Sequence, residues 1–381
     1  MTSLLDKMAR RREELARGGL LRQRRCFAAA PGRERLLHPV AQAQATGKPL
    51  LDFAANDYLG LARHPKVISA LAKGAEIYGC GSGASPLVSG YSEAHLKLEQ
   101  GLCRALGAEA ALLFSCGFAA NTALMKTLFS AEDTVIADKL VHASMIDGLR
   151  DSKAKIRRFA HNDMAAATTL LARHPGSAVL TETVFSMDGD RAPLGKLSHL
   201  CQEHGSPLIL DDAHGFGLFE SSSLPVFARL VTFGKALGGQ GAAIVGSQEL
   251  IDYLVANARE YIYSTALSPA CCMGVLEALE LIQQEPLLER LNANIVLFRR
   301  SCQVAGISLM PSESPIQPLL VGESDRCMAL AARLLERGFL VGAIRPPTVP
   351  KGSARLRITL SAEHREQDIL ALASALAELM A

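Results

Sequence analysis

The stretch from Pro207 to Lys235 decides the fold, because it contains two short strands whose ends carry polar side chains. It begins Pro-Leu-Ile-Leu-Asp-Asp-Ala-His-Gly-Phe-Gly at residues 207–217 and ends Leu-Val-Thr-Phe-Gly-Lys at residues 230–235. The apolar run at 208–210, bounded by a proline and two acids, predicts a buried strand of a parallel sheet. Asp211 then lies at the carboxyl end of that strand, where open α/β sheets bind ligands.

Four polar side chains are expected to converge from the two strand ends. Asp211 and His214 follow the first strand, and Thr232 and Lys235 follow a second strand expected at 230–233. A lysine amine can hold pyridoxal phosphate (PLP) as a Schiff base, and a buried Asp can keep the pyridine nitrogen of that cofactor protonated. Each residue alone is more often structural, as a turn cap, a core histidine or a solvated lysine. Together, at two strand ends, they favour a PLP site.

The chain alternates helices and short apolar strands from about residue 95 onward. This repetition predicts an α/β fold, with a mostly parallel sheet and helices on both of its faces. We predict an N-terminal helix and arm at 1–50, a large domain at 51–270 and a small α+β domain at 271–381. The other expected elements are strands at 50–53, 110–114, 134–137 and 179–182, and helices at 2–17, 65–78, 95–106, 118–129, 196–204, 270–284 and 366–380.

The composition is typical of an α/β enzyme. Of 381 residues, 49% are hydrophobic and 20% are charged, and 31 glycines indicate many tight turns. The net charge of +2 gives no overall attraction to nucleic acid or to anionic membranes. Seven arginines between residues 10 and 25 make the N-terminal end basic. A nucleic-acid-binding arm is one interpretation, but no aromatic residue precedes Phe27, which favours a solvated amphipathic helix.

The cysteines and the apolar stretches favour a cytoplasmic location. Nine cysteines without a Cys-x-x-Cys pair indicate reduced thiols, and we expect no metal site. The first twelve residues lack the apolar core of a secretory signal. No stretch is long and apolar enough to cross a bilayer, so no membrane association is expected.

Further candidate residues follow other expected strands. Gly117 lies between a strand and a helix, where it lets the backbone approach a ligand and free N–H groups suit a phosphate. His142 follows the strand at 134–137 and is placed to stack on a cofactor ring, although a lone histidine is more often structural. The glycine-rich segment 79–85 is not followed by Gly-Lys-Ser/Thr at the Walker spacing, which argues against an ATPase.

A serine and two arginines have an ordinary alternative to a functional role. Ser186 lies just past the strand at 179–182, where it could equally cap a turn. Arg345 and Arg357 lie in the small domain. A guanidinium can clamp a carboxylate through two hydrogen bonds, but a surface ion pair is the more common role of a single arginine.

Five motifs lie in a fixed order along the chain. They are Asn-Asp-Tyr-Leu-Gly at 56–60, Gly-Ser-Gly at 81–83, Ser-Met-Asp-Gly-Asp at 186–190, Asp-Asp-Ala-His-Gly at 211–215 and Thr-Phe-Gly-Lys at 232–235. The set resembles the α-oxoamine synthases from about residue 20 to the C-terminus, and such a set is far more specific than one motif. The resemblance implies a PLP enzyme of fold type I, with an aspartate-aminotransferase-like large domain and a small α+β C-terminal domain.

The resemblance also implies cofactor-binding roles. Lys235 is similar to the Schiff-base lysine, Asp211 to the partner of the pyridine nitrogen, and His142 to the ring-stacking histidine. The other implied contacts are the phenolic oxygen for His214 and Ser186, the phosphate for Thr232, and a backbone contact near the cofactor for Gly117 and Phe118. Relatives usually form homodimers with the site at the interface, which implies that Ser264 reaches the phosphate bound to the neighbouring copy.

Substrate contacts are implied at a second set of positions. They are Asn56, His142, Arg345, Thr348, Arg357 and an N-terminal arginine, for which Arg22 is preferred and Arg24 competes. Val-Ser-Gly-Tyr-Ser at 88–92 and Ala-Ile-Arg-Pro-Pro-Thr-Val-Pro at 343–350 look closest to the branch of the family that joins L-alanine to a pimeloyl thioester in biotin biosynthesis. Pimeloyl-CoA and pimeloyl-acyl carrier protein are both open as the acyl donor.

The implied chemistry is a decarboxylative Claisen condensation. Freed Lys235 is expected to remove the Cα proton of L-alanine, Arg357 to hold the carboxylate of L-alanine, and the carbanion to attack the thioester before CO2 is lost. One alternative is a sibling synthase that uses glycine or serine. Another is a non-catalytic partner subunit, against which the retention of Lys235, Asp211 and His214 argues. A basic-armed nucleic-acid binder is the third, and we expect no nucleic-acid partner.

Overall fold

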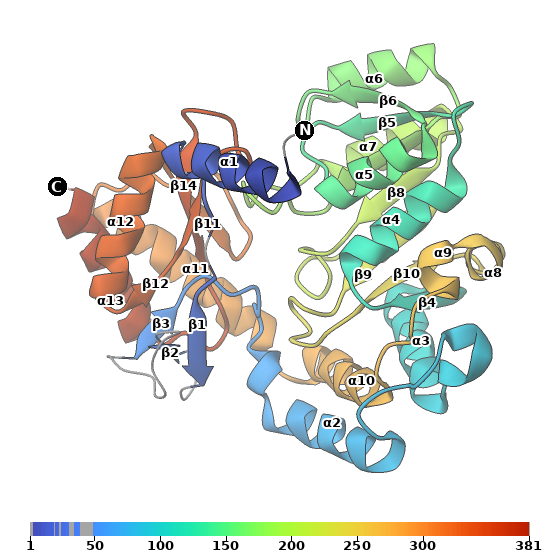
Figure 1. Ribbon diagram of the computed structural model, residues 1–381, viewed down its shortest axis with the longest axis horizontal. Helices are drawn as coiled ribbons and strands as arrows, with labels where there is room; N and C mark the ends of the chain where they lie inside the picture. Colours follow the sequence, from blue (N-terminus) through green and yellow to red (C-terminus); the bar gives the residue numbers. More distant parts are fainter. Residues whose placement is uncertain (1–2, 19, 23, 30–33, 39–48, 381) are drawn as a thin grey trace. The chain divides into compact units, whose positions relative to one another are not determined.

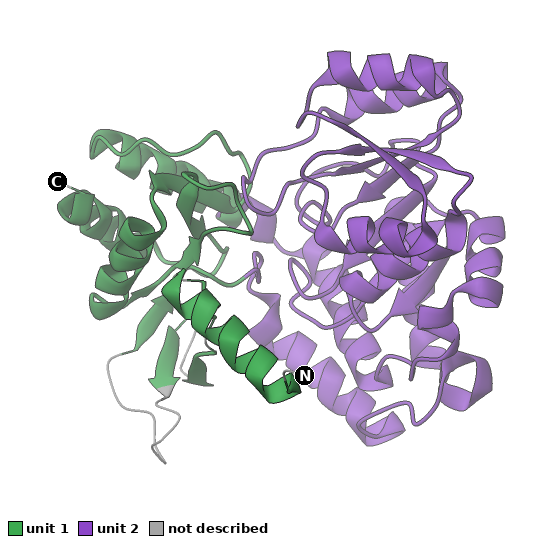
Figure 2. Ribbon diagram, turned by 45° about the horizontal axis from the view of Figure 1, so that its top comes forward, with its two compact units in different colours: residues 1–55, 291–381 green, residues 56–290 purple. Residues whose placement is uncertain are grey.

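The computed structural model describes residues 3–18, 20–22, 24–29, 34–38 and 49–380. The chain divides into two compact units, which Figure 2 shows in different colours. Unit 1 comprises residues 1–55 and 291–381, and unit 2 comprises residues 56–290.

Unit 2 is built on a seven-stranded sheet in the order β4-β10-β9-β8-β7-β5-β6 (Figure 1). All strand pairs are parallel except the two that β10 makes with β4 and β9. The carboxyl ends of β4, β5, β7, β8 and β9 therefore lie at one edge. The strands are β4 (Ala110–Phe114), β5 (Thr134–Asp138), β6 (Lys155–Phe159), β7 (Ala178–Glu182), β8 (Leu208–Asp211), β9 (Ala228–Thr232) and β10 (Ala242–Gly246).

Helices cover both faces of this sheet, as the sequence predicts. Alternate residues of one strand enter different cores: Val135 and Ala137 join one cluster, and Ile136 joins the other. The first cluster includes side chains of α4 (Gly117–Leu128), α5 (Ala143–Ser152), α8 (Gln248–Asn257) and α9 (Arg259–Ile262). The second includes side chains of α6 (Met164–Arg173) and α7 (Leu194–Glu203).

Three further helices of unit 2 pack together through glycines. Helix α10 (Pro269–Gln284) contacts both α2 (Pro65–Tyr78) and α3 (Glu93–Leu106). A Cβ atom on Gly74 would lie 2.7 Å from the Cα of Ala270, so a larger residue would force α2 and α10 apart. This packing keeps α10 in unit 2, beyond the domain boundary expected at residue 270. Two short turns, η1 (Leu61–Arg63) and η2 (Pro86–Gly90), complete this part of the chain.

The described residues of unit 1 form two small sheets and four helices. The sheets have the orders β1-β2-β3-β12 and β11-β14-β13. The strands are β1 (Cys26–Ala29), β2 (Glu34–His38), β3 (Leu50–Asp52), β11 (Ile316–Gly322), β12 (Phe339–Leu340), β13 (Gly342–Ile344) and β14 (Ala354–Thr359). The helices are α1 (Leu4–Arg17), α11 (Leu287–Val304), α12 (Ser324–Glu336) and α13 (Glu366–Met380). Helix α11 begins four residues before the unit boundary.

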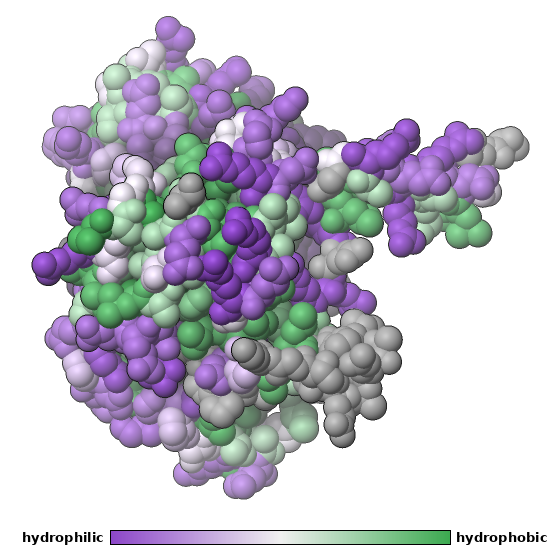
Figure 3. Space-filling view, turned by 90° about the vertical axis from the view of Figure 1, so that its left-hand side faces the viewer, coloured by the Kyte–Doolittle hydropathy of each residue, from purple (hydrophilic) through white to green (hydrophobic). Residues whose placement is uncertain are grey.

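Helix α1 is amphipathic and solvated, as predicted. None of its residues is buried, and Leu4, Leu5 and Met8 are all exposed. In Figure 3 it projects as a mostly hydrophilic rod with a hydrophobic patch along one side. Within the described ranges, no helix combines the length and the hydropathy needed to cross a bilayer.

Candidate active site

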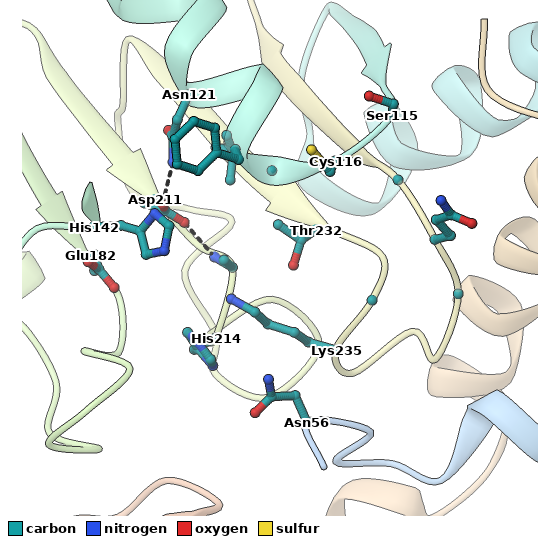
Figure 4. A pocket seen from close by; sticks show the side chains of 18 residues that line it. Asn56, Ser115, Cys116, Asn121, His142, Glu182, Asp211, His214, Thr232 and Lys235 are labelled. Atoms are coloured by element: carbon teal, nitrogen blue, oxygen red, sulfur yellow. Dashed lines mark hydrogen bonds between the residues drawn. The ribbon is translucent and has the colours of Figure 1, made fainter. Parts of the chain in front are cut away.

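A cavity of about 350 Å³ lies at the carboxyl edge of the large sheet, within unit 2. Residues that follow five different strands contribute to its wall, because parallel strands bring their carboxyl ends to the same edge. Figure 4 shows the amine of Lys235 directed into the cavity, with His214 and Asn56 beside it. The other side chains that line it are Ser115, Cys116, Phe118, Asn121, His142, Glu182, Ala213, Asp211, Leu230, Thr232 and Gln240.

Asp211 is held in one orientation at the end of β8. Its Oδ1 accepts a hydrogen bond of 3.0 Å from the backbone N–H of Ala213, and its Oδ2 accepts one of 2.7 Å from Nδ2 of Asn121. The residue is only 4% exposed. A buried carboxylate fixed by two neutral donors is suited to receive a hydrogen bond from a cationic ring nitrogen in the cavity.

His142 faces the cavity as a neutral imidazole. It is the N-cap of α5, and its Nδ1 accepts from the backbone N–H of Ser144 at 3.3 Å. Because a backbone N–H can only donate, Nδ1 is the acceptor and Nε2 carries the proton. Burial lowers the pKa of His142, and the nearby charge of Lys235 lowers it further, while Asp211 opposes the shift. Phe118 meets the ring edge-on, with 6.5 Å between centroids.

Lys235 and Thr232 come from the end of β9 and the turn after it. The turn is tight: a Cβ atom on Gly238, whose φ is +63°, would lie 2.2 Å from the backbone nitrogen of Ala62. Lys235 is half-buried, and its amine reaches the cavity (Figure 4). Oγ1 of Thr232 is buried and has no hydrogen-bond partner among the described residues. An unpartnered buried hydroxyl in a cavity wall is suited to a polar ligand atom.

The start of α4 lies next to Thr232 and is suited to an anion. A Cβ atom on Gly117 would lie 2.6 Å from Cγ2 of Thr232, so glycine keeps this corner open. Cys116 is the N-cap of α4, and no side chain caps the helix there. The first N–H groups of α4 are therefore available to an anion, which the helix dipole also favours.

A buried tyrosine, Tyr58, positions two residues of the cavity wall, His214 and Asn56. The hydroxyl of Tyr58, which is fully buried, lies 2.6 Å from Nδ1 of His214 and donates a hydrogen bond of 3.3 Å to Oδ1 of Asn56. His214 and Asn56 are thus oriented by a residue 156 positions before the histidine.

Comparisons with known proteins identify the family. The family model for class I and II aminotransferases matches residues 48–376. The 8-amino-7-oxononanoate synthase of Aeromonas salmonicida is 47% identical over 345 residues, which cover 87% of this chain and 86% of the relative. The chain belongs to the 8-amino-7-oxononanoate synthases, within the class I and II aminotransferases.

Solved structures support the same family. An 8-amino-7-oxononanoate synthase from Francisella tularensis has a TM-score of 0.75 and 30% identity, covering 86% of this chain and 97% of its own. A serine palmitoyltransferase variant from S. paucimobilis with bound PLP has a TM-score of 0.90 and 26% identity, covering 99% of this chain and 98% of its own. The fold prediction, PLP fold type I, is confirmed.

PLP is the cofactor of this family, and the cavity suits it. The N–H groups at the start of α4 and the unpartnered hydroxyl of Thr232 are suited to the phosphate. Asp211 is suited to the ring nitrogen, His142 to one face of the ring and Lys235 to the aldehyde carbon. The PLP prediction is confirmed by the family and by the PLP-bound neighbour.

Two residues that were predicted to contact the cofactor, Ser186 and Ser264, do not line the cavity. Ser186 lies in the loop after β7, half-buried, and Ser264 lies after α9, also half-buried. The loop of Ser186 is held at Asp190, which contacts Nε2 of His161 at 2.7 Å. The roles of Ser186 and Ser264 stay predictions.

The predicted substrate residues of the C-terminal part gather within unit 1. Nη2 of Arg22 donates a hydrogen bond of 3.2 Å to Oγ1 of Thr348, and Nη2 of Arg345 donates one of 3.2 Å to the carbonyl of Leu21. Arg357 is buried in β14 and donates to Oγ1 of Thr359 at 3.2 Å. The substrate-binding roles of these residues, and the choice between Arg22 and Arg24, stay predictions.

Sequence reasoning missed two buried polar residues in the cavity wall. Glu182 ends β7 beside Asp211, and burial, followed by the charge of Asp211, raises the pKa of Glu182 well above its ordinary value. Asn121 is 2% exposed on α4 and donates to Asp211. Glu182 could have been found by the pattern that identified Asp211, which is an acid at the end of an apolar strand. An asparagine inside a helix, such as Asn121, has no comparable sequence pattern.

Proposed function

We propose that this protein catalyses the PLP-dependent condensation of L-alanine with a pimeloyl thioester in biotin biosynthesis. The products are 8-amino-7-oxononanoate, CO2 and the free thiol. The observation that carries the proposal is the convergence of Lys235, Asp211 and His142 on one cavity, in a chain 47% identical to an 8-amino-7-oxononanoate synthase.

When bound, PLP supplies an electron-withdrawing ring that stabilises negative charge on the Cα atom of the amino acid. Asp211, which its two neutral donors hold in place, would accept a hydrogen bond from the ring nitrogen and stabilise the positive charge there. His142 would cover one face of the ring as a neutral imidazole, which would add no positive charge to compete with that nitrogen.

Lys235 is the general base of the proposed reaction. Its amine reaches the cavity from a turn that Gly238 keeps tight, so its nitrogen can take a proton from the Cα atom of L-alanine. The same amine returns a proton after CO2 is lost. Tyr58 holds Asn56 and His214 in the cavity wall beside Lys235. From there Asn56 would contact the substrate and His214 the phenolic oxygen of PLP.

Arg357 is the proposed partner of the alanine carboxylate, because it is a buried arginine in the small α+β part of the chain. Arg22, Thr348 and Arg345 are proposed to contact the acyl substrate, since two hydrogen bonds tie their segments together. CoA and acyl carrier protein are both candidates for the acyl carrier.

The activity is tested with three amino acids and three acyl donors. L-Alanine, glycine and L-serine are each combined with pimeloyl-CoA, pimeloyl-acyl carrier protein and palmitoyl-CoA, and both thiol release and product mass are measured. We expect turnover with L-alanine and a pimeloyl donor only. Turnover with L-serine and palmitoyl-CoA would replace the proposal by the serine palmitoyltransferase activity, which the TM-score of 0.90 keeps as the second candidate. No turnover in any combination with PLP-loaded protein would support a non-catalytic partner subunit.

We also propose a cytoplasmic homodimer. Large apolar side chains of unit 2, among them Leu87, Val88 and Tyr263, are 49%, 81% and 71% exposed, as expected for residues that a second copy covers. Nine free cysteines are in keeping with a reducing compartment. Sedimentation equilibrium at micromolar concentration tests the dimer, and a monomer mass would contradict it.

A further inference from the structure

A continuous chain of hydrogen bonds joins Asp211 to His142 through Asn121 and Ser144. Nδ2 of Asn121 donates to Oδ2 of Asp211 at 2.7 Å and to Oγ of Ser144 at 3.0 Å. Oγ of Ser144 lies 2.7 Å from Nδ1 of His142. Figure 4 shows Asn121 on α4 pointing at Asp211, with His142 beside it. The two residues proposed to contact the ring nitrogen and one face of the ring are thus linked through the side chains of Asn121 and Ser144.

The directions of these bonds are fixed by the donors. The amide of Asn121 donates both of its hydrogens, one to each neighbour. Oγ of Ser144 accepts one of them, so its own hydrogen is free to donate to Nδ1 of His142. The backbone N–H of Ser144 donates to the same nitrogen at 3.3 Å. His142 is therefore held as the tautomer with its proton on Nε2.

Asn121 lowers the stability of the folded chain, and its packing in α4 does not explain why an asparagine is there. It is 2% exposed in the interior of α4, and its Oδ1 is buried with no hydrogen-bond partner among the described residues. An unsatisfied buried acceptor destabilises a folded chain, and asparagine is a poor helix former. An apolar residue would suit this position better if packing were its only role.

We propose that Asn121 and Ser144 are positioning residues, which hold Asp211 and His142 in the orientation and hydrogen-bonded form that bound PLP requires. The proposal rests on the proposed function, since it concerns the cofactor site of that enzyme. The charged and titratable groups that face His142 are Asp211, Lys235, Asp147 and Glu182, and of these Asp211 alone is also bonded to Asn121.

The two substitutions at Asn121 separate its shape from its donor hydrogens. Asn121→Ala removes the donor to Asp211 and also the unsatisfied Oδ1. Asn121→Asp keeps the size but places a second carboxyl group against Asp211, so that the two must share a proton. Ser144→Ala removes only the link to Nδ1 of His142. Thr122→Val is the matched control, because Thr122 is the next residue of α4 and its buried Oγ1 has no partner among the described residues.

The readouts are the dissociation constant of PLP and the pH titration of its visible band, both measured on the full-length protein without substrate. We expect Asn121→Ala to raise the dissociation constant by about tenfold or more and to shift the titration, with an unchanged or higher Tm of the apoprotein. Asn121→Asp should bind more weakly still at pH 8 and recover toward the alanine variant near pH 5. Ser144→Ala should shift the titration, and Thr122→Val should behave as wild type.

Wild-type affinity and an unchanged titration in both Asn121→Ala and Ser144→Ala would overturn the proposal, as would an equal effect of Thr122→Val. If Asn121→Ala does not fold, the titration of Ser144→Ala decides. A wild-type protein that binds no PLP would instead contradict the proposed function, so the two failures are distinguishable.

Discussion

Glu182 and Asp211 are partners in register at the carboxyl ends of the parallel strands β7 and β8. Two buried carboxyl groups thus lie side by side in the cavity wall. Asp211 has Asn121 and Ala213 as donors, whereas burial and the nearby Asp211 raise the pKa of Glu182 well above its ordinary value. This shift favours the protonated form of Glu182, next to the carboxyl group of Asp211.

Glu182→Gln should keep PLP binding and turnover near the wild-type level, because glutamine has the size of the neutral acid. The pKa of Glu182 is higher in the folded than in the unfolded protein, so Glu182 does not reduce the stability of the fold at a pH below its unfolded pKa. As the pH rises above the unfolded pKa, the unfolded chain loses this proton more readily, and the free energy of unfolding falls. The Tm of the variant apoprotein should therefore exceed that of wild type by roughly 1–3 °C at pH 8, with a smaller difference at pH 5. A tenfold loss of kcat, or a gap that narrows with rising pH, would mean that Glu182 is ionised.

If Thr232 has the proposed role, Thr232→Val should weaken PLP binding by about 10- to 100-fold, because a buried hydroxyl that would donate to the phosphate is lost. Fluorescence titration of the apoprotein with PLP measures this. Thr122→Val serves as the control again, since it removes another buried, unpartnered hydroxyl outside the cavity wall. Equal affinity of Thr232→Val and wild type would remove Thr232 from the phosphate subsite.

Gly117→Ala should close the same subsite from the other side. The added Cβ atom would lie 2.6 Å from Cγ2 of Thr232, so the start of α4 or the end of β9 must shift. We expect a loss of PLP affinity of about tenfold or more. The double variant with Thr232→Ser, which removes Cγ2, should recover part of that affinity. If the second change brings no recovery, the contact between the two residues is not the cause.

The stability of the protein should fall at alkaline pH because His161 loses its proton there. Burial lowers its pKa, but hydrogen bonds with Asp138 and Asp190 outweigh this and raise the pKa to about 10. The unfolded value is about 6.5, so the stabilisation is fully present below pH 6.5 and is lost as the pH rises to about 10. The Tm of wild type should fall toward that of His161→Gln across this range. A constant difference from pH 6 to 10 would contradict the charged state, and His199→Gln, an exposed residue of α7, is the control.

Much of the large sheet could be predicted from the sequence. Strand β4 and helices α2 and α13 have the predicted bounds, because apolar runs and helix-period patterns end there at polar or glycine residues. Strand β6 was missed because it reads Lys-Ile-Arg-Arg-Phe, the charged pattern of an edge strand. Strand β10 was missed because Ala-Ala-Ile-Val-Gly contains only two β-branched residues and no polar side chain that points to a ligand site.

The site could be predicted where chemistry and strand ends coincide. Asp211, Thr232 and Lys235 are polar residues at or just after the carboxyl end of apolar strands, and they line one cavity. Tyr58 and Asn121 could not be found in this way. Their functional contacts join residues 156 and 90 positions apart, and only the folded chain brings such residues together.

The visible absorption spectrum of the PLP-loaded protein, recorded before and after L-alanine, tests the central claim most directly. Wild type should be yellow, and L-alanine should shift its spectrum while glycine and L-serine should not. Lys235→Ala should keep the Tm of wild type but lose at least about 10³-fold in turnover with pimeloyl donors. A protein that stays colourless after incubation with PLP, or a Lys235→Ala variant with normal turnover, would contradict the account.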